Sequence, residues 1–259
     1  MNNTFSFRRF SLLFSKHTTE YYKTYLLSVA VLLGLLAAIL GFSSYVSGGP
    51  IHEKAQLAIF WVFLLSAGSI FTSMVFSDFG DKRKSISMLT LPVSHFEKYL
   101  VAWLYSFVIF QLIFLVSFYA VDYLVLLIGN SGESQGLKIM NVFSAEEDYK
   151  LVFLFYAILH SLAFLGAIFF EKIHFIKTAF VVLLLCLLAV LVNQPIADAL
   201  FDVKLEKVVP FVSIGIQEGG HYYQISPLPS IEPVMFGLSL ACIGLLWIGA
   251  YFKLKEKEV

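Results

Sequence analysis

Few side chains in this sequence have the chemistry and spacing for catalysis or metal binding. Its six His residues are scattered, no H-E-x-x-H zinc pattern occurs, and the acidic pair Glu146 and Glu147 has no His at metal-ligand spacing. The phosphate-binding pattern G-x-x-x-x-G-K-[ST] does not occur in the 259 residues. We therefore predict that the chain itself is not an enzyme and binds no metal, nucleotide or other cofactor.

Two polar side chains interrupt long apolar runs, where such groups are costly and usually have a partner. Gln111 and His160 each fall near the middle of a run. They are candidates for lining a translocation path, or for hydrogen-bonding across helices. Because no carboxylate stands near His160 in the sequence, we favour the second role for it. Asp122 lies closer to the outer end of its run, where we expect it to meet water.

The elements that must position these residues are membrane-spanning helices. Hydrophobic residues make up 59% of the chain and charged residues 14%, with a mean hydropathy of +0.81. Such values indicate a membrane protein and give no sign of nucleic-acid binding. Runs of about 20 apolar residues, enough to cross the hydrocarbon layer, occur near 25–47, 55–77, 100–128, 150–170, 177–193 and 233–252. We predict an all-α polytopic membrane protein with six transmembrane helices in one domain, residues 1–259.

The positive charges predict the orientation of these spans. Cytoplasmic loops carry the excess of Lys and Arg, and 13 of the 18 such residues precede the first span, follow the last, or lie in the second and fourth connections. Both termini are therefore expected to be cytoplasmic. The two longer outer loops are 129–149 and 194–232. The second contains KVVPFVSIGI, whose β-branched residues suit a small strand pair, and either a gating or docking role or an inert loop is compatible with it.

Residues 1–24 precede the first span and are too polar to cross the membrane. Phe7, Phe10 and Phe14 recur at helical spacing, whereas Arg8 and Arg9 point mostly elsewhere, a pattern typical of a helix lying in the membrane interface. A cleaved signal peptide is the alternative, but the stretch before the apolar run is long and no clear A-x-A site follows it. We therefore predict an uncleaved, amphipathic interfacial helix anchored by these five residues.

The connection at residues 78–98 combines a basic cluster with a helix start. Ser94 and Glu97 match a capping box, which predicts that the third span begins there. Pro92 lies just ahead, and a proline disfavours helix at the residue before it. Upstream, a short amphipathic piece mixes apolar residues with the cluster DKRK, residues 81–84. Taken alone, these charges are explained by topology and by contact with anionic lipid headgroups.

Residues 76–103, FSDFGDKRKSISMLTLPVSHFEKYLVAW, resemble the loop between the second and third spans of ABC-2 type (type-2 exporter class) ABC transporter permeases. In that family an amphipathic coupling helix is followed by a phrase of the form L-x-L-P-V-S-x-x-E, which here begins at Leu89. The family's Glu-Gly pair in the coupling helix corresponds to Gly80 and Asp81. The order of an interfacial helix and six spans is also similar.

This resemblance implies a permease subunit of an ATP-driven export system in a plasma membrane, with a bacterial inner membrane as the expected location. The chain would form half of a dimeric path, surrounded by membrane lipid, with a second copy or a similar permease. ATP and Mg²⁺ would be bound by separate ABC ATPase subunits. The resemblance assigns coupling to Gly80, Asp81, Lys82, Arg83, Lys84, Ile86, Leu89, Pro92, Ser94 and Glu97. An ion-driven carrier, a scaffold of a membrane complex and a membrane-embedded hydrolase are the alternatives.

Overall fold

The computed structural model describes residues 5–75, 92–129, 138–143, 149–170, 173–201, 214–218, 221–225 and 231–257. Six helical runs in these parts are long and apolar enough to cross a membrane, so the prediction of a multi-pass helical membrane protein is confirmed. The third run changes character along its length, since α5 passes through a π-helical segment, η1, into α6. The elements are α1 Phe7–Ser47, α2 Glu53–Val75, α5 His95–Trp103, η1 Leu104–Ile109, α6 Phe110–Gly129, α7 Tyr149–Phe169, α8 His174–Phe201 and α9 Glu232–Lys257.

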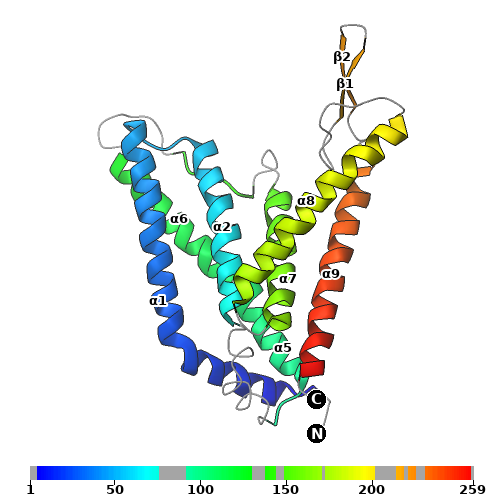
Figure 1. The fold of residues 1–259 in the computed structure, drawn as a ribbon. Helices are drawn as coiled ribbons and strands as arrows, with labels where there is room; N and C mark the ends of the chain where they lie inside the picture. Colours follow the sequence, from blue (N-terminus) through cyan, green and yellow to red (C-terminus); the bar gives the residue numbers. More distant parts are fainter. Residues whose placement is uncertain are drawn as a thin grey trace.

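Helix α1 joins two predicted elements, the helix before the first span and the span itself, into one run of 41 residues. Figure 1 shows that it changes direction: its first part lies across the ends of other helices, and its second part rises alongside α6. The sequence holds no Gly or Pro from residue 7 to residue 33, so the helix has no reason to stop there. Thr18 and Thr19 donate hydrogen bonds back to the carbonyls of Phe14 and Ser15, an interaction that favours bending.

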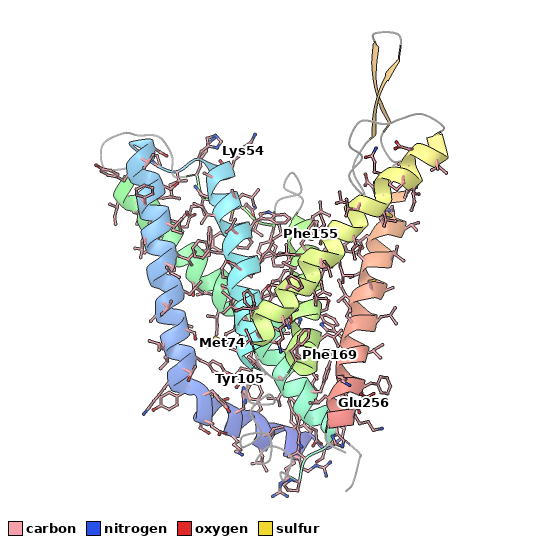
Figure 2. All side chains as sticks on the ribbon, in the orientation of Figure 1. Lys54, Met74, Tyr105, Phe155, Phe169 and Glu256 are labelled. Carbon is pink, nitrogen blue, oxygen red and sulfur yellow. The ribbon has the colours of Figure 1, made fainter. Side chains whose placement is uncertain are left out.

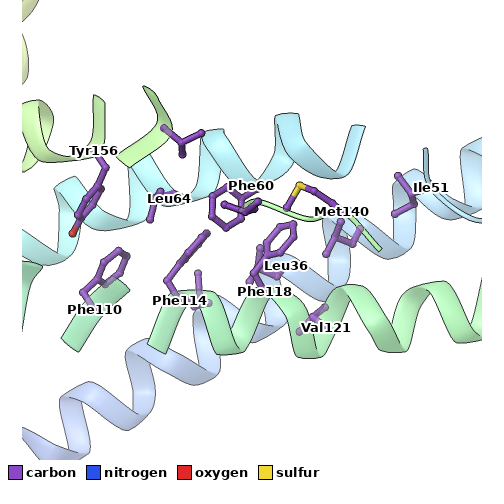
Figure 3. Close-up of a cluster of buried hydrophobic side chains, with 14 residues drawn as sticks. Leu36, Ile51, Phe60, Leu64, Phe110, Phe114, Phe118, Val121, Met140 and Tyr156 are labelled. Atoms are coloured by element: carbon purple, nitrogen blue, oxygen red, sulfur yellow. The ribbon is translucent and has the colours of Figure 1, made fainter. Parts of the chain in front are cut away.

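Buried apolar side chains of the described residues form two main cores and a small cluster of Leu13, Val101 and Tyr105. The larger core lies between α1, α2 and α6, where Phe60 meets Phe114 and Phe118 edge-on with ring centroids 5.3 and 5.1 Å apart (Figure 3). Edge-to-face rings are a favourable aromatic geometry. The smaller core joins α5, α7 and α9 around the fully buried Phe164 and Leu254. Helices in lipid associate through such close packing and through small residues. Gly68 on α2 is an example, because a side chain at this position would clash with the ring of Tyr156 on α7.

Helix α8 is longer than the sequence predicts, and this corrects the start of the second outer loop. It runs through Pro195 to Phe201, whereas the loop was expected from residue 194. A proline removes one backbone hydrogen bond, but helices in membranes tolerate it, and the Gln194 amide donates to Asp198 across the next turn at 3.2 Å. The predicted strand pair is present, displaced toward the C-terminus: β1 Ile214–Glu218 pairs antiparallel with β2 His221–Ile225.

The start of α1 and the end of α9 lie at the same end of the molecule, and the hairpin lies at the opposite end (Figure 1). This arrangement follows from an even number of membrane-crossing runs. Between α6 and α7 the structure describes residues 138–143, which are not helical. The Gln56 side chain of α2 holds this segment: its amide donates to the Lys138 carbonyl at 3.1 Å and its oxygen accepts from the Met140 N–H at 2.9 Å.

Candidate functional site

The predicted capping box at the start of α5 is confirmed. The Ser94 hydroxyl oxygen accepts from the Glu97 N–H at 3.2 Å, and the Ser94 N–H donates to Glu97 Oε2 at 2.9 Å. Ser94 itself is extended, with φ −69° and ψ 153°, as a residue before a helix should be. Helix α5 therefore begins at a defined residue, two positions after Val93 and three after Pro92.

The carboxylate of Glu97 also closes the start of α1. Its second oxygen, Oε1, accepts from the Ser6 N–H at 2.6 Å and from Arg9 Nη2 at 3.2 Å. Ser6 is the N-cap residue of α1, and its own side chain makes no cap hydrogen bond. In a capping box the third helical residue would supply the carboxylate. Here that residue is Arg9, which cannot accept, so Glu97 supplies the carboxylate from another helix and pairs with Arg9.

We call these four residues, Ser6, Arg9, Ser94 and Glu97, the Glu97 junction. The Glu97 side chain is 0% exposed and that of Arg9 is 30% exposed. A buried carboxylate is tolerated when donors surround it, and an anion is favoured at a helix N-terminus because backbone N–H groups point toward it. One side chain therefore fastens the first part of α1 to the start of the third span.

Aromatic packing continues the junction along α1. Phe14 stacks on Tyr105 of η1 with ring centroids 4.9 Å apart, and Phe10 packs against the small cluster of Leu13, Val101 and Tyr105. Phe7 and Arg8, in contrast, are exposed. The five predicted anchor residues thus divide into three that contact α5 or η1 and two that face outward. The internal contacts gave no signal in the sequence, because the partners lie about 90 positions away along the chain.

Much of the predicted coupling segment lies outside the described residues. This applies to seven of its residues: Gly80, Asp81, Lys82, Arg83, Lys84, Ile86 and Leu89. Three of the predicted coupling residues are described, Pro92, Ser94 and Glu97, and the last two belong to the Glu97 junction. On the α5 side the junction therefore begins at Ser94, three positions after residue 91, the last residue of the segment that lies outside the described structure.

His160 belongs to a buried hydrogen-bond network between α7, α9 and η1. The Trp247 indole N–H donates to His160 Nδ1 at 3.2 Å, and His160 Nε2 lies 2.9 Å from Ser106 Oγ. Because an indole only donates, Nδ1 accepts and the neutral ring carries its proton on Nε2. The Ser106 hydroxyl oxygen then accepts a hydrogen bond from the Nε2–H group, and the hydroxyl donates to the Ala102 carbonyl at 2.8 Å. Both His160 and Ser106 are fully buried, and the ring has the cross-helix hydrogen bonds that we favoured for it.

The other polar residues in the spans have different surroundings. Gln111, the second candidate for the translocation path, is half-buried on α6. Asp122 is fully buried, which corrects the expectation that it meets water near the end of the span. Both of its carboxylate oxygens have no hydrogen-bond partner among the described residues. The sequence misled us because distance from the end of a helix does not reveal which face of that helix is covered.

No cluster of three or more His, Cys, Asp or Glu residues that could hold a metal ion occurs within the described ranges. The letters G-x-S-x-G do occur once, at residues 132–136, but a nucleophile elbow requires a strand before the serine and a helix after it. These five residues lie outside the described structure, in the connection between α6 and α7. No protein-family model, curated protein or solved structure matches this chain.

Proposed function

We propose that this chain is the permease subunit of an ATP-driven ABC export system, forming half of a dimeric translocation path in a plasma membrane. Both termini lie in the cytoplasm, and the first part of α1 lies in the membrane interface. ATP and Mg²⁺ are bound by separate ATPase subunits. The observation that carries the proposal is the Glu97 junction. It joins the start of α1 to the start of α5, close behind the residues that resemble a coupling helix.

The junction gives a physical route for coupling. A displacement of residues 80–91 by an ATPase subunit reaches Pro92 and then Ser94, where the chain enters α5. Because Glu97 holds the start of α1 through Ser6 and Arg9, the first part of α1 moves together with α5. The third span then carries the displacement into the membrane, as a continuous helical run from His95 to Gly129.

The test is purification of the chain together with the ABC ATPase encoded nearest to its gene, followed by measurement of ATP hydrolysis. We expect a stable complex in detergent, and we expect its hydrolysis rate to change when Asp81, Lys82, Arg83 and Lys84 are replaced by Ala. The ATPase without the permease is the reference. Failure to form a complex across several lipid and detergent conditions would contradict the proposal and favour a carrier or scaffold.

Two adjacent arginines offer a matched comparison for the junction itself. Arg9→Gln removes the ion pair with Glu97, in which Arg9 Nη2 and Glu97 Oε1 lie 3.2 Å apart. Arg8→Gln removes the same charge from the neighbouring exposed residue. We expect Arg9→Gln to weaken the dependence of ATP hydrolysis on the permease and Arg8→Gln to leave it near the unsubstituted value. Equal effects of the two substitutions would assign the change to surface charge and remove the junction from the coupling route.

A further inference from the structure

A groove with a volume of about 740 Å³ opens between α1 and α2, with η1 and the start of α6 behind it. Nearly all the surface that lines it is apolar. The groove exists because α1 packs on α5 and α6 and scarcely touches α2, and because α2 presents the small side chains of Ser66 and Ala67 there. Figure 2 shows Met74 and Tyr105, which line one end of the groove, in the space between these helices.

The wall of the groove on α2 is about as long as one leaflet of a bilayer. This wall extends from Phe63 to Met74, which at 1.5 Å per residue is about 16 Å. Half of a hydrocarbon layer is roughly 15 Å thick. The next turns of α2 and α6 contribute Phe60 and Phe114 to the closed core, so the groove ends near the middle of these helices. Its dimensions suit one extended hydrocarbon chain.

The end of the groove nearest the start of α1 is lined by hydroxyl groups, and a positive charge lies beside it. The hydroxyl groups of Thr18 and Tyr105 hydrogen-bond to each other there. Tyr22 also lines the groove, and the Lys23 ammonium lies 5.9 Å from the centroid of its ring. Lys23 is exposed and does not itself line the groove, but its contact with the Tyr22 ring places one positive charge beside this end. A positive charge there favours an anionic group.

We propose that the groove binds an anionic phospholipid of the cytoplasmic leaflet, with one acyl chain between α1 and α2 and the headgroup beside Lys23. The inference rests on the membrane orientation in the proposed function, and it does not depend on coupling to an ATPase. Anionic lipids are enriched on the cytoplasmic face of membranes and attract basic residues there. The acyl chain fills the apolar contacts that α1 and α2 do not make with each other, so the bound lipid holds α1 in place.

Two positions one turn apart on α2 provide a matched test. Ser66 lines the groove and Val62 does not, yet both are exposed on the same face of the helix. The protein is purified in a mild detergent, and its co-purifying phospholipid is identified and counted by native mass spectrometry. We expect about one anionic phospholipid per chain, and a fall of about tenfold or more in Ser66→Phe, because the ring takes the place of several buried methylene groups. We expect no fall in Val62→Phe.

A second variant tests the headgroup without changing the groove. The Lys23 side chain is exposed, so Lys23→Gln should leave the fold intact. After delipidation, the protein is titrated with phosphatidylglycerol or phosphatidylcholine while its thermal stability is followed. The unsubstituted protein should be stabilised more by phosphatidylglycerol, and Lys23→Gln should lose that preference while still gaining stability from both lipids.

Three outcomes would overturn the assignment. Equal lipid retention in Ser66→Phe and Val62→Phe would mean that the lipid binds elsewhere on the surface. Co-purification of a neutral amphiphile in place of a phospholipid would make the groove a site for a different ligand. Equal stabilisation by the two lipids in the unsubstituted protein would remove the role of Lys23. None of these outcomes bears on whether the chain binds an ATPase, which the complex with that subunit tests separately.

Discussion

Replacement of Glu97 by Gln is the sharpest test of the junction between α1 and α5. Gln keeps the size and shape of the side chain but replaces one carboxylate oxygen by an NH₂ group. In the structure Oε1 accepts from Ser6 and Arg9, and Oε2 accepts from the Ser94 N–H. Every contact of the carboxylate is therefore with a donor. The NH₂ group of Gln must face at least one N–H group that it cannot satisfy.

The expected loss of stability follows from this geometry. The least costly arrangement places the NH₂ group toward Ser94, which removes one cap hydrogen bond worth about 1 kcal/mol. The contacts with Ser6 and Arg9 remain but lose the charge of the acceptor, which weakens them by about 0.5–1 kcal/mol each. The total is about 2–3 kcal/mol. For a chain of this size each kcal/mol corresponds to about 2–4 °C in melting temperature, so a decrease of about 4–12 °C is expected.

The assay is thermal unfolding in one detergent and one buffer, monitored by differential scanning fluorimetry. The matched control is Glu256→Gln, which removes a surface ion pair with Lys253, where the glutamate side chain is 66% exposed. Exposed pairs contribute little, so this variant should shift the melting temperature by less than about 2 °C. If Glu97→Gln and Glu256→Gln have the same melting temperature, the junction does not hold α1, and the argument from buried donors is wrong.

Three further substitutions use the same assay. Asp122→Leu should raise the melting temperature, since a buried polar group without a partner costs about 1–3 kcal/mol, and both carboxylate oxygens lack one among the described residues. Gly68→Ala should destabilise the protein by about 1–3 kcal/mol through overpacking against the buried tyrosine ring of α7. Gly237→Ala, whose added methyl group meets nothing within 4 Å, is its control. Trp247→Phe should cost about 1–2 kcal/mol, because it leaves His160 Nδ1 without a donor.

Opposite results would be informative in each case. A lower melting temperature for Asp122→Leu would mean that the carboxyl group binds a water molecule, an ion or another chain. Equal melting of Gly68→Ala and Gly237→Ala would show that α2 and α7 separate easily. If Trp247→Phe has no effect, the His160 network does not join α9 to η1, and a role for this histidine on a translocation path regains support.

Features that depend on neighbours in the chain were predictable. Six runs of apolar residues became six helices long enough to span a membrane, because crossing hydrocarbon requires consecutive apolar residues that any reading of the sequence can find. The capping box at Ser94 was also predictable, since its two partners stand three positions apart. The end of α8 was missed for a local reason, because a proline weakens a helix without necessarily ending it.

The sequence by itself therefore determined the class of protein, the six described helical runs that are long and apolar enough to span a membrane, and the residue at which the third run begins. Only the tertiary structure decided that Glu97 also closes α1, that Asp122 is buried, and that α1 and α2 leave an apolar groove between them. The physical reason is the same in all three cases. Side-chain surroundings in a helical membrane protein depend on which helices lie side by side, and close packing between distant segments leaves no local pattern in the sequence.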